Sequence, residues 1–143
     1  MAKLNDLNRN YKKTEKLMNV TVDELFPELK RKIRIFKSIN QNIFIWGGGS
    51  KSLIFLIYLK SFNPTAFKKV KFAIDIDKDK QNKLLQIVNI KIISPKTLIK
   101  VIKLGDTIIV ANSNYFNEIK KYVKSYKLKK INYRFLDQLK TLI

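Results

Sequence analysis

The sequence predicts a doubly wound parallel α/β sheet over about residues 42–143. Short β-branched runs alternate there with helix-length amphipathic stretches, which is the pattern of parallel strands joined by helices. The runs are continuously apolar, as expected when helices cover both faces of the sheet. The chain has 143 residues, 45% of them hydrophobic, enough for one core but not for two. Right-handed crossovers then favour the strand order 3-2-1-4-5.

Residues 1–41 are predicted to form an N-terminal helical extension. Thr21 followed by Glu24 has the form of a capping box, and Pro27 suits the first turn of a helix, so we expect a break near Phe26. The clearest apolar stripe at spacings of three and four is Val22, Leu25, Leu29, Ile33 and Phe36.

About five strands and four connecting helices are predicted in the α/β part. The strands are Ile43–Trp46, Val70–Asp75, Ile90–Ile93, Thr107–Ala111 and Ile131–Phe135. The helices are Ser50–Phe62, a short piece around Gln81–Val88, Pro95–Lys103 and Tyr115–Tyr126. Ser94 is the expected cap of the third helix, with Pro95 in its first turn.

The loop after the first strand is the strongest candidate for a ligand site. In such sheets ligands bind outside the carboxyl ends of the strands, at the switch between strands 1 and 4. Three of the four glycines lie in this loop, directly before a helix whose free N–H groups can bind a phosphate or carboxylate. We therefore predict ligand contacts from Gly47, Gly48, Gly49, Ser50 and Lys51.

The spacing of this loop is close to a dinucleotide-binding fingerprint of Rossmann-like domains. Gly47 and Gly49 occupy the first two glycine positions, and Ser52 replaces the third with another small residue. A P-loop is excluded, because Ser50 precedes Lys51 and Ile45 stands where the distal glycine would be. We expect a side chain at Gly49 to block a ligand and to disfavour the turn. The alternative is a glycine turn that only connects strand to helix.

Two further loops at the same edge carry polar residues. Asp75 and Asp77 follow the second strand, where a carboxylate can accept both ribose hydroxyl hydrogen bonds. We expect Asp75 to set ligand selectivity with little effect on folding; a solvated turn acid is the alternative. Asn112, Asn114 and Tyr115 follow the fourth strand and are candidate contacts for a sugar or base. The alternative for this segment is helix capping by Asn114 or Ser113.

Catalytic and metal chemistry is restricted by composition. The chain has no Cys and no His, which excludes disulfides, a thiol nucleophile, an imidazole base and a Cys/His zinc site, and no metal site is predicted. Glu118, near the start of the last predicted helix, is a candidate general acid or base. The alternative is an ordinary helix-start anion close to Lys121 and Lys124.

The net charge of +19 is weak evidence for a nucleic-acid partner. Only four of the 30 basic residues are Arg, and Lys, Ile and Asn are all in excess, as in a genome rich in A and T. Nucleic-acid readers favour Arg, with aromatic residues among the charges. We therefore expect a solvated Lys surface that attracts anionic ligands in general.

Nothing in the sequence predicts a membrane span. The longest apolar run, Leu53–Leu59, has seven residues, whereas a span needs roughly 20. The N-terminus also lacks an apolar signal region, so we expect a cytoplasmic protein.

Residues 28–128 resemble the C-terminal domain of sugar C-methyltransferases. The resemblance lies in the glycine loop, in Ile74–Gln81, in Ile93–Pro95 and in Val110–Ile119. Asn82 replaces a turn glycine of that family, and Asn tolerates the positive φ that such a turn needs. The matching residues are Gly47, Gly49, Asp75, Lys80, Gln81, Ser94, Pro95, Asn114, Tyr115, Glu118 and Ile119.

The resemblance implies a nucleotide-binding-like fold that helps to hold a nucleotide-sugar. In that family the methyl donor S-adenosylmethionine binds a separate central domain, and a Cys-rich zinc segment precedes it. This chain has no recognisable domain of that kind and no Cys, and Trp46 stands where S-adenosylmethionine enzymes usually place an acid. The implied function is therefore binding of a nucleotide or nucleotide-sugar in surface-polysaccharide sugar modification, beside a separate methyltransferase or sugar-processing subunit.

Two other functions stay open from the sequence. One is a small dinucleotide-dependent oxidoreductase or transferase, in which Glu118, Tyr115 or Lys51 would supply the acid or base. The other is a nucleic-acid-binding protein acting through its Lys-rich surface. The sequence leaves the ligand or cofactor unidentified.

Overall fold

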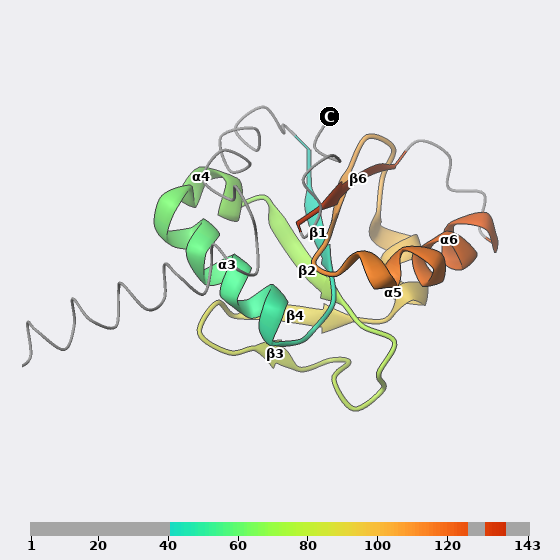
Figure 1. Cartoon of the computed structure of the whole chain (residues 1–143), viewed down its shortest axis with the longest axis horizontal. Helices are drawn as coiled ribbons and strands as arrows, with labels where there is room; N and C mark the ends of the chain where they lie inside the picture. Colours follow the sequence, from blue (N-terminus) through green and yellow to red (C-terminus); the bar gives the residue numbers. More distant parts are fainter. Residues whose placement is uncertain (1–40, 126–130, 137–143) are drawn as a thin grey trace, which may run out of the picture.

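The computed structural model describes residues 41–125 and 131–136, which form a mixed, mostly parallel sheet between two layers of helices (Figure 1). The strands are β1 (Ile43–Trp46), β2 (Val70–Ile74), β3 (Leu84–Leu85), β4 (Ile90–Ile93), β5 (Thr107–Val110) and β6 (Asn132–Phe135). The helices are α3 (Ser50–Phe62), α4 (Pro64–Phe67), α5 (Pro95–Val101), the 3₁₀ turn η2 (Ser113–Tyr115) and α6 (Phe116–Ser125).

The sheet has six strands in the order β3-β4-β2-β1-β5-β6, so the predicted count of about five and the predicted order 3-2-1-4-5 were incomplete, although the five predicted strands follow one another as predicted. The difference is the two-residue strand β3, which pairs antiparallel with β4 at one edge. The other neighbouring pairs, from β4 across to β6, are parallel. The α/β class with crossover helices is therefore as predicted.

The segment Gln81–Val88 is not the short helix that the sequence predicts. It contains turns and β3, and its backbone has positive φ at Asn82 (64°) and Ile87 (73°), followed by Asn89 (56°). A helix cannot contain such residues, because right-handed helical backbone requires negative φ. The positive φ expected at Asn82 is confirmed.

The other predicted helices are present, with small differences at their ends. Helix α3 has the predicted bounds, and α5 begins at Pro95 with the Ser94 hydroxyl accepting the Thr97 N–H, as expected. Helix α5 ends at Val101, two residues before the predicted end at Lys103. The unpredicted α4 follows α3 because the Asn63 side chain accepts the Ala66 N–H and Pro64 occupies the first turn.

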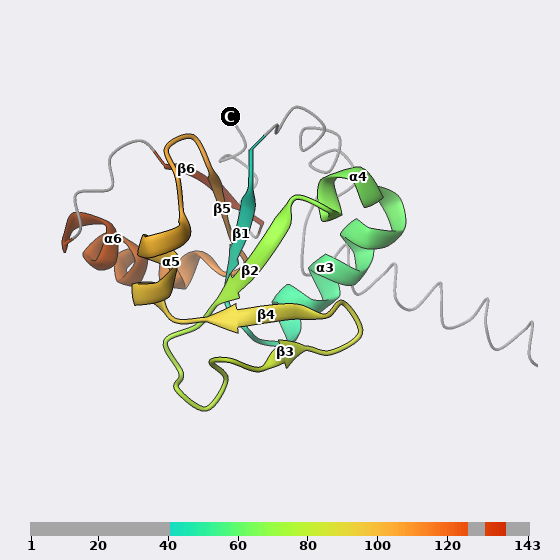
Figure 2. The same ribbon diagram turned by 180° about the vertical axis from the view of Figure 1, so that it is seen from behind.

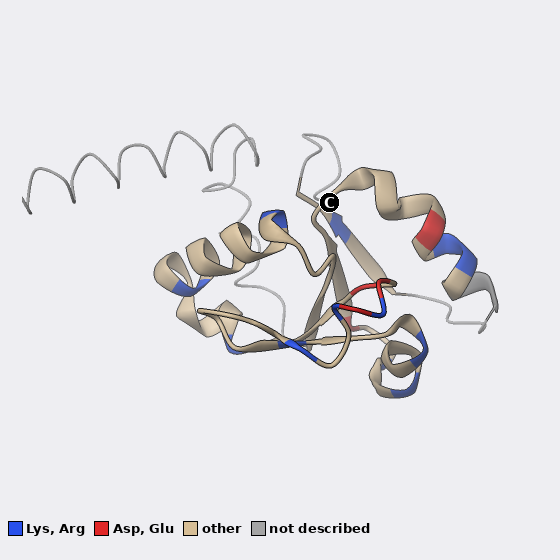
Figure 3. Ribbon diagram, turned by 90° about the horizontal axis from the view of Figure 1, so that it is seen from below, with Lys and Arg blue, Asp and Glu red and all other residues tan. Residues whose placement is uncertain are grey.

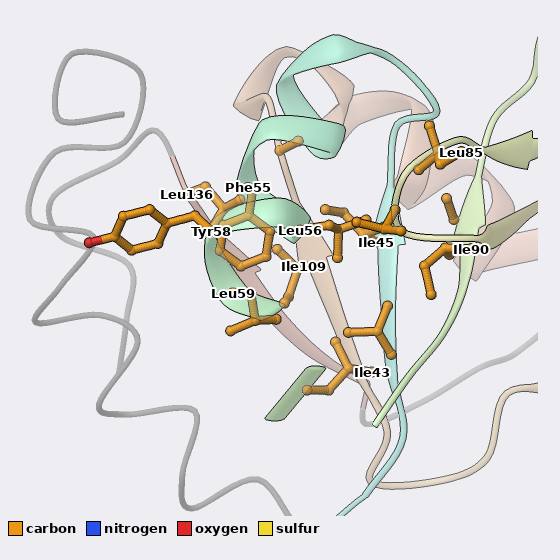
Figure 4. Close-up of a cluster of buried hydrophobic side chains, with 14 of the residues drawn as sticks. Ile43, Ile45, Phe55, Leu56, Tyr58, Leu59, Leu85, Ile90, Ile109 and Leu136 are labelled. Atoms are coloured by element: carbon orange, nitrogen blue, oxygen red, sulfur yellow. The ribbon is translucent and has the colours of Figure 1, made fainter. Parts of the chain in front are cut away.

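Strand β1 explains why the strand sequences are apolar at every position. Ile43 and Ile45 face α3 and pack with Phe55, Leu56 and Leu59, as Figure 4 shows in part. Phe44 and Trp46 face the other layer, formed by α5 and α6, and Figures 1 and 2 show the two layers on opposite sides of the sheet. Both faces are therefore covered, and alternation would leave polar groups buried.

The predicted helical extension at residues 1–41 lies, except for Gln41, outside the described residues, as does the predicted helix end at Tyr126. Within 41–125 and 131–136, no helix has the length and apolar character that crossing a membrane requires.

Candidate functional site

Four strand ends lie level at one edge of the sheet. Trp46 pairs with Ile74 on one side and with Val110 on the other, and Ile74 also pairs with Ile93. The residues that follow these strand ends therefore begin four loops at the same height. These are the loops that the sequence selects for ligand binding, and β1 lies between them at the point where the chain switches direction across the sheet.

The first two glycines of the loop after β1 are held tightly by their surroundings. Gly47 has φ +119°, and its N–H donates to the Ile74 carbonyl oxygen at 2.7 Å. A Cβ there would lie 3.1 Å from the buried Ser52 hydroxyl. A Cβ on Gly48 would lie 3.0 Å from the Asp75 carboxylate and 3.1 Å from Ile92. Close packing explains why both positions are glycine, and Ser52 is small for the same reason.

Gly49 differs from its two neighbours. Its φ of −105° and ψ of −171° are extended backbone that any residue adopts, so the expectation that this turn position needs glycine was wrong. Apart from its two chain neighbours, none of the described residues has an atom within 4 Å of the position that a Cβ would take at Gly49. Neither backbone conformation nor packing explains the glycine, and the space beside it is open.

Helix α3 begins directly at this open space. Gly49 is its N-cap and supplies no side-chain cap, and the first turn contains no acidic residue. The positive end of the α3 dipole is therefore not compensated by a side chain of the helix itself. Ser50 is exposed and Lys51 is half-buried at this helix start.

Asp75 is held by the backbone of two loops. Its Oδ2 accepts the Gly48 N–H at 2.9 Å, and its Oδ1 accepts the Asp77 N–H at 2.9 Å. The Lys80 ammonium lies 3.6 Å from Oδ2, and the Gln81 side-chain amide donates to the Asp75 carbonyl oxygen at 2.9 Å. The carboxylate thus joins the loop after β1 to the loop after β2, a role that sequence reasoning missed.

Asp77 lies further out in the same loop. It is exposed, and its Oδ1 accepts the Asp79 N–H at 2.9 Å, which is a local turn interaction. Its carboxylate therefore stabilises the turn, whereas that of Asp75 faces the glycine loop.

The loop after β5 places an aromatic ring beside the glycines. Tyr115, which is 39% exposed, has its ring 3.6 Å from the position of a Cβ on Gly47. The Asn112 side chain accepts the Asn114 N–H at 3.0 Å, so Asn112 caps η2. Asn114 itself is exposed.

Glu118 completes this edge from α6. The Trp46 side chain, buried at the end of β1, forms a hydrogen bond with the Glu118 carboxylate, and the Oε1 atom of Glu118 is buried with no hydrogen-bond partner among the residues that the structure describes. Burial raises the pKa of Glu118 above its ordinary value of 4.5; the Trp46 hydrogen bond opposes this shift, and the negative charge of Asp75 adds to it. Glu118 is thus no ordinary solvated helix-start anion.

Glu118→Gln is expected to become more stable relative to wild type as pH rises. Because the folded protein holds the Glu118 proton more tightly than the unfolded chain does, the favourable contribution of Glu118 is complete below the ordinary pKa of 4.5. It is lost as pH rises through the raised pKa, whereas Gln stays neutral. Urea denaturation of both proteins between about pH 4 and about pH 7 measures this difference. A difference independent of pH would contradict it.

The charges of the described residues do not gather on one element. Figure 3 shows basic segments spread over α3, α5, α6 and the strands, whereas acidic segments mark the loop after β2 and the start of α6. Residues 41–125 and 131–136 contain no group of three or more Asp or Glu side chains placed to hold a metal ion.

No protein-family model matches the chain, and no curated protein matches it.

Proposed function

We propose that the chain binds a nucleotide or nucleotide-sugar at the edge formed by the glycine loop, Asp75 and Tyr115. The observation that carries this proposal is Gly49, an N-cap that supplies no side-chain cap, beside whose Cβ position the described residues, apart from its two chain neighbours, place no atom within 4 Å. A phosphate placed there would accept hydrogen bonds from the start of α3 and meet the positive end of its dipole. The Tyr115 ring offers a surface on which a base or sugar can stack.

The biological setting of this binding rests on the resemblance to the C-terminal domain of sugar C-methyltransferases. We infer that the ligand is a nucleotide-sugar used in surface-polysaccharide modification and that a separate methyltransferase or sugar-processing subunit supplies the catalysis. The buried Trp46 at the end of β1 supports this division of labour, because an acid at that position is the usual contact for S-adenosylmethionine.

The test is calorimetric titration of the full chain with UDP-glucose, dTDP-glucose, NAD⁺ and a DNA duplex. We expect a nucleotide-sugar to bind more tightly than NAD⁺, and DNA binding to be lost between low and physiological salt, as counterion release predicts. Preferred binding of NAD⁺ would instead favour the dinucleotide-dependent enzyme. Sequence-selective DNA binding at physiological salt would favour the nucleic-acid alternative.

Gly49→Val should weaken nucleotide-sugar binding by about tenfold or more while the fold stays intact. A branched side chain would fill the space in which the phosphate approaches α3, and its hydrogen bonds to the helix start would be lost. Extended backbone accommodates Val, and the poorer N-cap should cost about 1 kcal/mol or less of stability.

Gly49→Ala and Lys96→Ala are the matched controls. Ala fills less of the space and should give a smaller loss of affinity. Lys96 is exposed in the first turn of the neighbouring helix α5, so its removal measures how much binding depends on general positive charge. Equal affinities of wild type and Gly49→Val for every nucleotide-sugar tested would rule out the phosphate position.

A further inference from the structure

One segment without acidic residues carries most of the exposed apolar side chains of the described part of the chain. Residues 80–105 contain β3, β4, α5 and the turns beside them. Four of the seven large hydrophobic side chains that are exposed among the described residues belong to this segment: Leu84, Ile87, Val101 and Leu104. The segment also has six Lys, all exposed, and no Asp or Glu. Positive charge and exposed apolar surface therefore occur together.

The pairing of β3 with β4 shows which face of the sheet these side chains occupy. Leu84 pairs with Lys91, and Leu85 pairs with Ile90. Leu85 and Ile90 are buried in the core cluster that includes α3. Because successive side chains of a strand point to opposite faces, Leu84 and Lys91 point to the face on which α5 packs. Leu84 is 54% exposed and Lys91 is also exposed, so α5 leaves this part of the sheet uncovered.

Helix α5 continues the same side of the molecule, which Figure 2 views directly. Leu98 is buried in the cluster on this face of the sheet and marks the inner side of the helix. Lys96, Lys100 and Val101 are exposed, and Leu104 is exposed in the turn that follows. We define the α5 face as the surface formed by Leu84, Lys91, Lys96, Lys100, Val101 and Leu104.

The composition of the α5 face discriminates between kinds of anionic partner. Residues 80–105 contain no Arg and no aromatic residue. Nucleic-acid-binding surfaces rely on Arg and on aromatic rings that stack with bases, and protein–protein interfaces are depleted in Lys. An anionic lipid surface needs neither Arg nor aromatic rings, because it attracts Lys by charge and accepts aliphatic side chains at the acyl boundary. Lys interspersed with Leu and Val fits a lipid surface best.

We propose that the α5 face docks on the surface of an anionic phospholipid bilayer. The Lys side chains lie against the phosphates of the headgroups, and Leu84, Val101 and Leu104 insert at the boundary between headgroups and acyl chains. The contact is peripheral and depends on both the charge and the aliphatic side chains. It is independent of the proposed nucleotide-sugar site, because the α5 face includes no residue of the glycine loop, Asp75 or Tyr115.

Co-sedimentation of the full chain with phosphatidylcholine vesicles, prepared with and without phosphatidylglycerol, tests the docking. We expect wild type to bind the mixed vesicles at physiological salt and not to bind phosphatidylcholine alone. Lys91→Gln combined with Lys100→Gln should weaken binding to the mixed vesicles by about tenfold or more. Leu84→Ser combined with Leu104→Ser should weaken it by about tenfold without any change of charge.

Matched controls lie in the helices on the opposite side of the sheet. Lys60→Gln combined with Lys68→Gln removes the same charge from exposed positions at the ends of α3 and α4. Phe62→Ser removes an apolar side chain that is 61% exposed at the end of α3. Neither control should weaken vesicle binding by more than about twofold, because screening confines the attraction to charges close to the lipid surface.

Absence of wild-type binding to the mixed vesicles would overturn the inference. Equal losses for the α5-face Lys pair and the control Lys pair would show attraction by net charge alone and would overturn it as well. If the Lys pair weakens binding and the Leu pair does not, no side chain inserts into lipid, and an acidic protein or a nucleic acid becomes the better partner. Thermal unfolding verifies that each variant is folded, and the two pairs test the docking separately.

Discussion

Gly47→Val is expected to destabilise the protein by about 3 kcal/mol. The φ of +119° at Gly47 lies in a region that L side chains rarely adopt, and the added Cβ would meet the buried Ser52 hydroxyl at 3.1 Å. Relieving this strain by rotating the backbone would break the 2.7 Å hydrogen bond from the Gly47 N–H to Ile74.

Gly49→Val is the control for this prediction, because it adds the same side chain two residues away. The backbone there is extended and the described residues beyond its chain neighbours leave the Cβ position free of contacts, so the loss of stability should be about 1 kcal/mol or less. Urea denaturation of both variants measures the difference. Similar stabilities would mean that the loop rearranges freely and does not present a rigid surface to a ligand.

Asp75→Asn is expected to lower the free energy of unfolding by about 1–3 kcal/mol. The two oxygens of Asp75 accept the Gly48 and Asp77 N–H groups, and an Asn side chain would turn an amino group toward one of these donors. This differs from the small effect on folding that the sequence suggests. The ion pair with Lys80 should add little, because Lys80 is 45% exposed.

Asp77→Asn should lower the free energy of unfolding by less than half as much as Asp75→Asn. Asp77 is exposed and its carboxylate accepts the Asp79 N–H, which water can satisfy instead. Denaturation of both variants should be paired with titration of UDP-glucose, because a disordered glycine loop would also weaken binding. Wild-type stability in Asp75→Asn would show that Asp75 is not needed to hold the two loops together.

The parallel strands and the helices α3, α5 and α6 were predictable because their signals are local in the sequence. The apolar run of β1 and the Ser94-Pro95 helix start each depend on residues within one turn or strand. The segment Gln81–Val88 was wrongly predicted as a helix because its apolar residues have helical spacing. The structure instead has positive φ at Asn82, Ile87 and Asn89, and β3 pairs with β4 there. Edge pairing of two residues leaves almost no pattern in a sequence.

The sequence by itself determined the α/β class, the bounds of α3 and the choice of the loops that carry Gly47, Asp75 and Tyr115. Apolar periodicity, glycine and helix-capping residues each influence the backbone over only a few neighbouring residues, so these features can be predicted from local sequence. Only the tertiary structure decided how those loops are used. It shows that Asp75 holds Gly48, that Gly49 faces open space and that the carboxylate of Glu118 lies half-satisfied beside Trp46. Gly48 and Asp75 are 27 positions apart in the sequence, and Trp46 and Glu118 are 72 positions apart. Their proximity follows from strand order and register and from no local pattern.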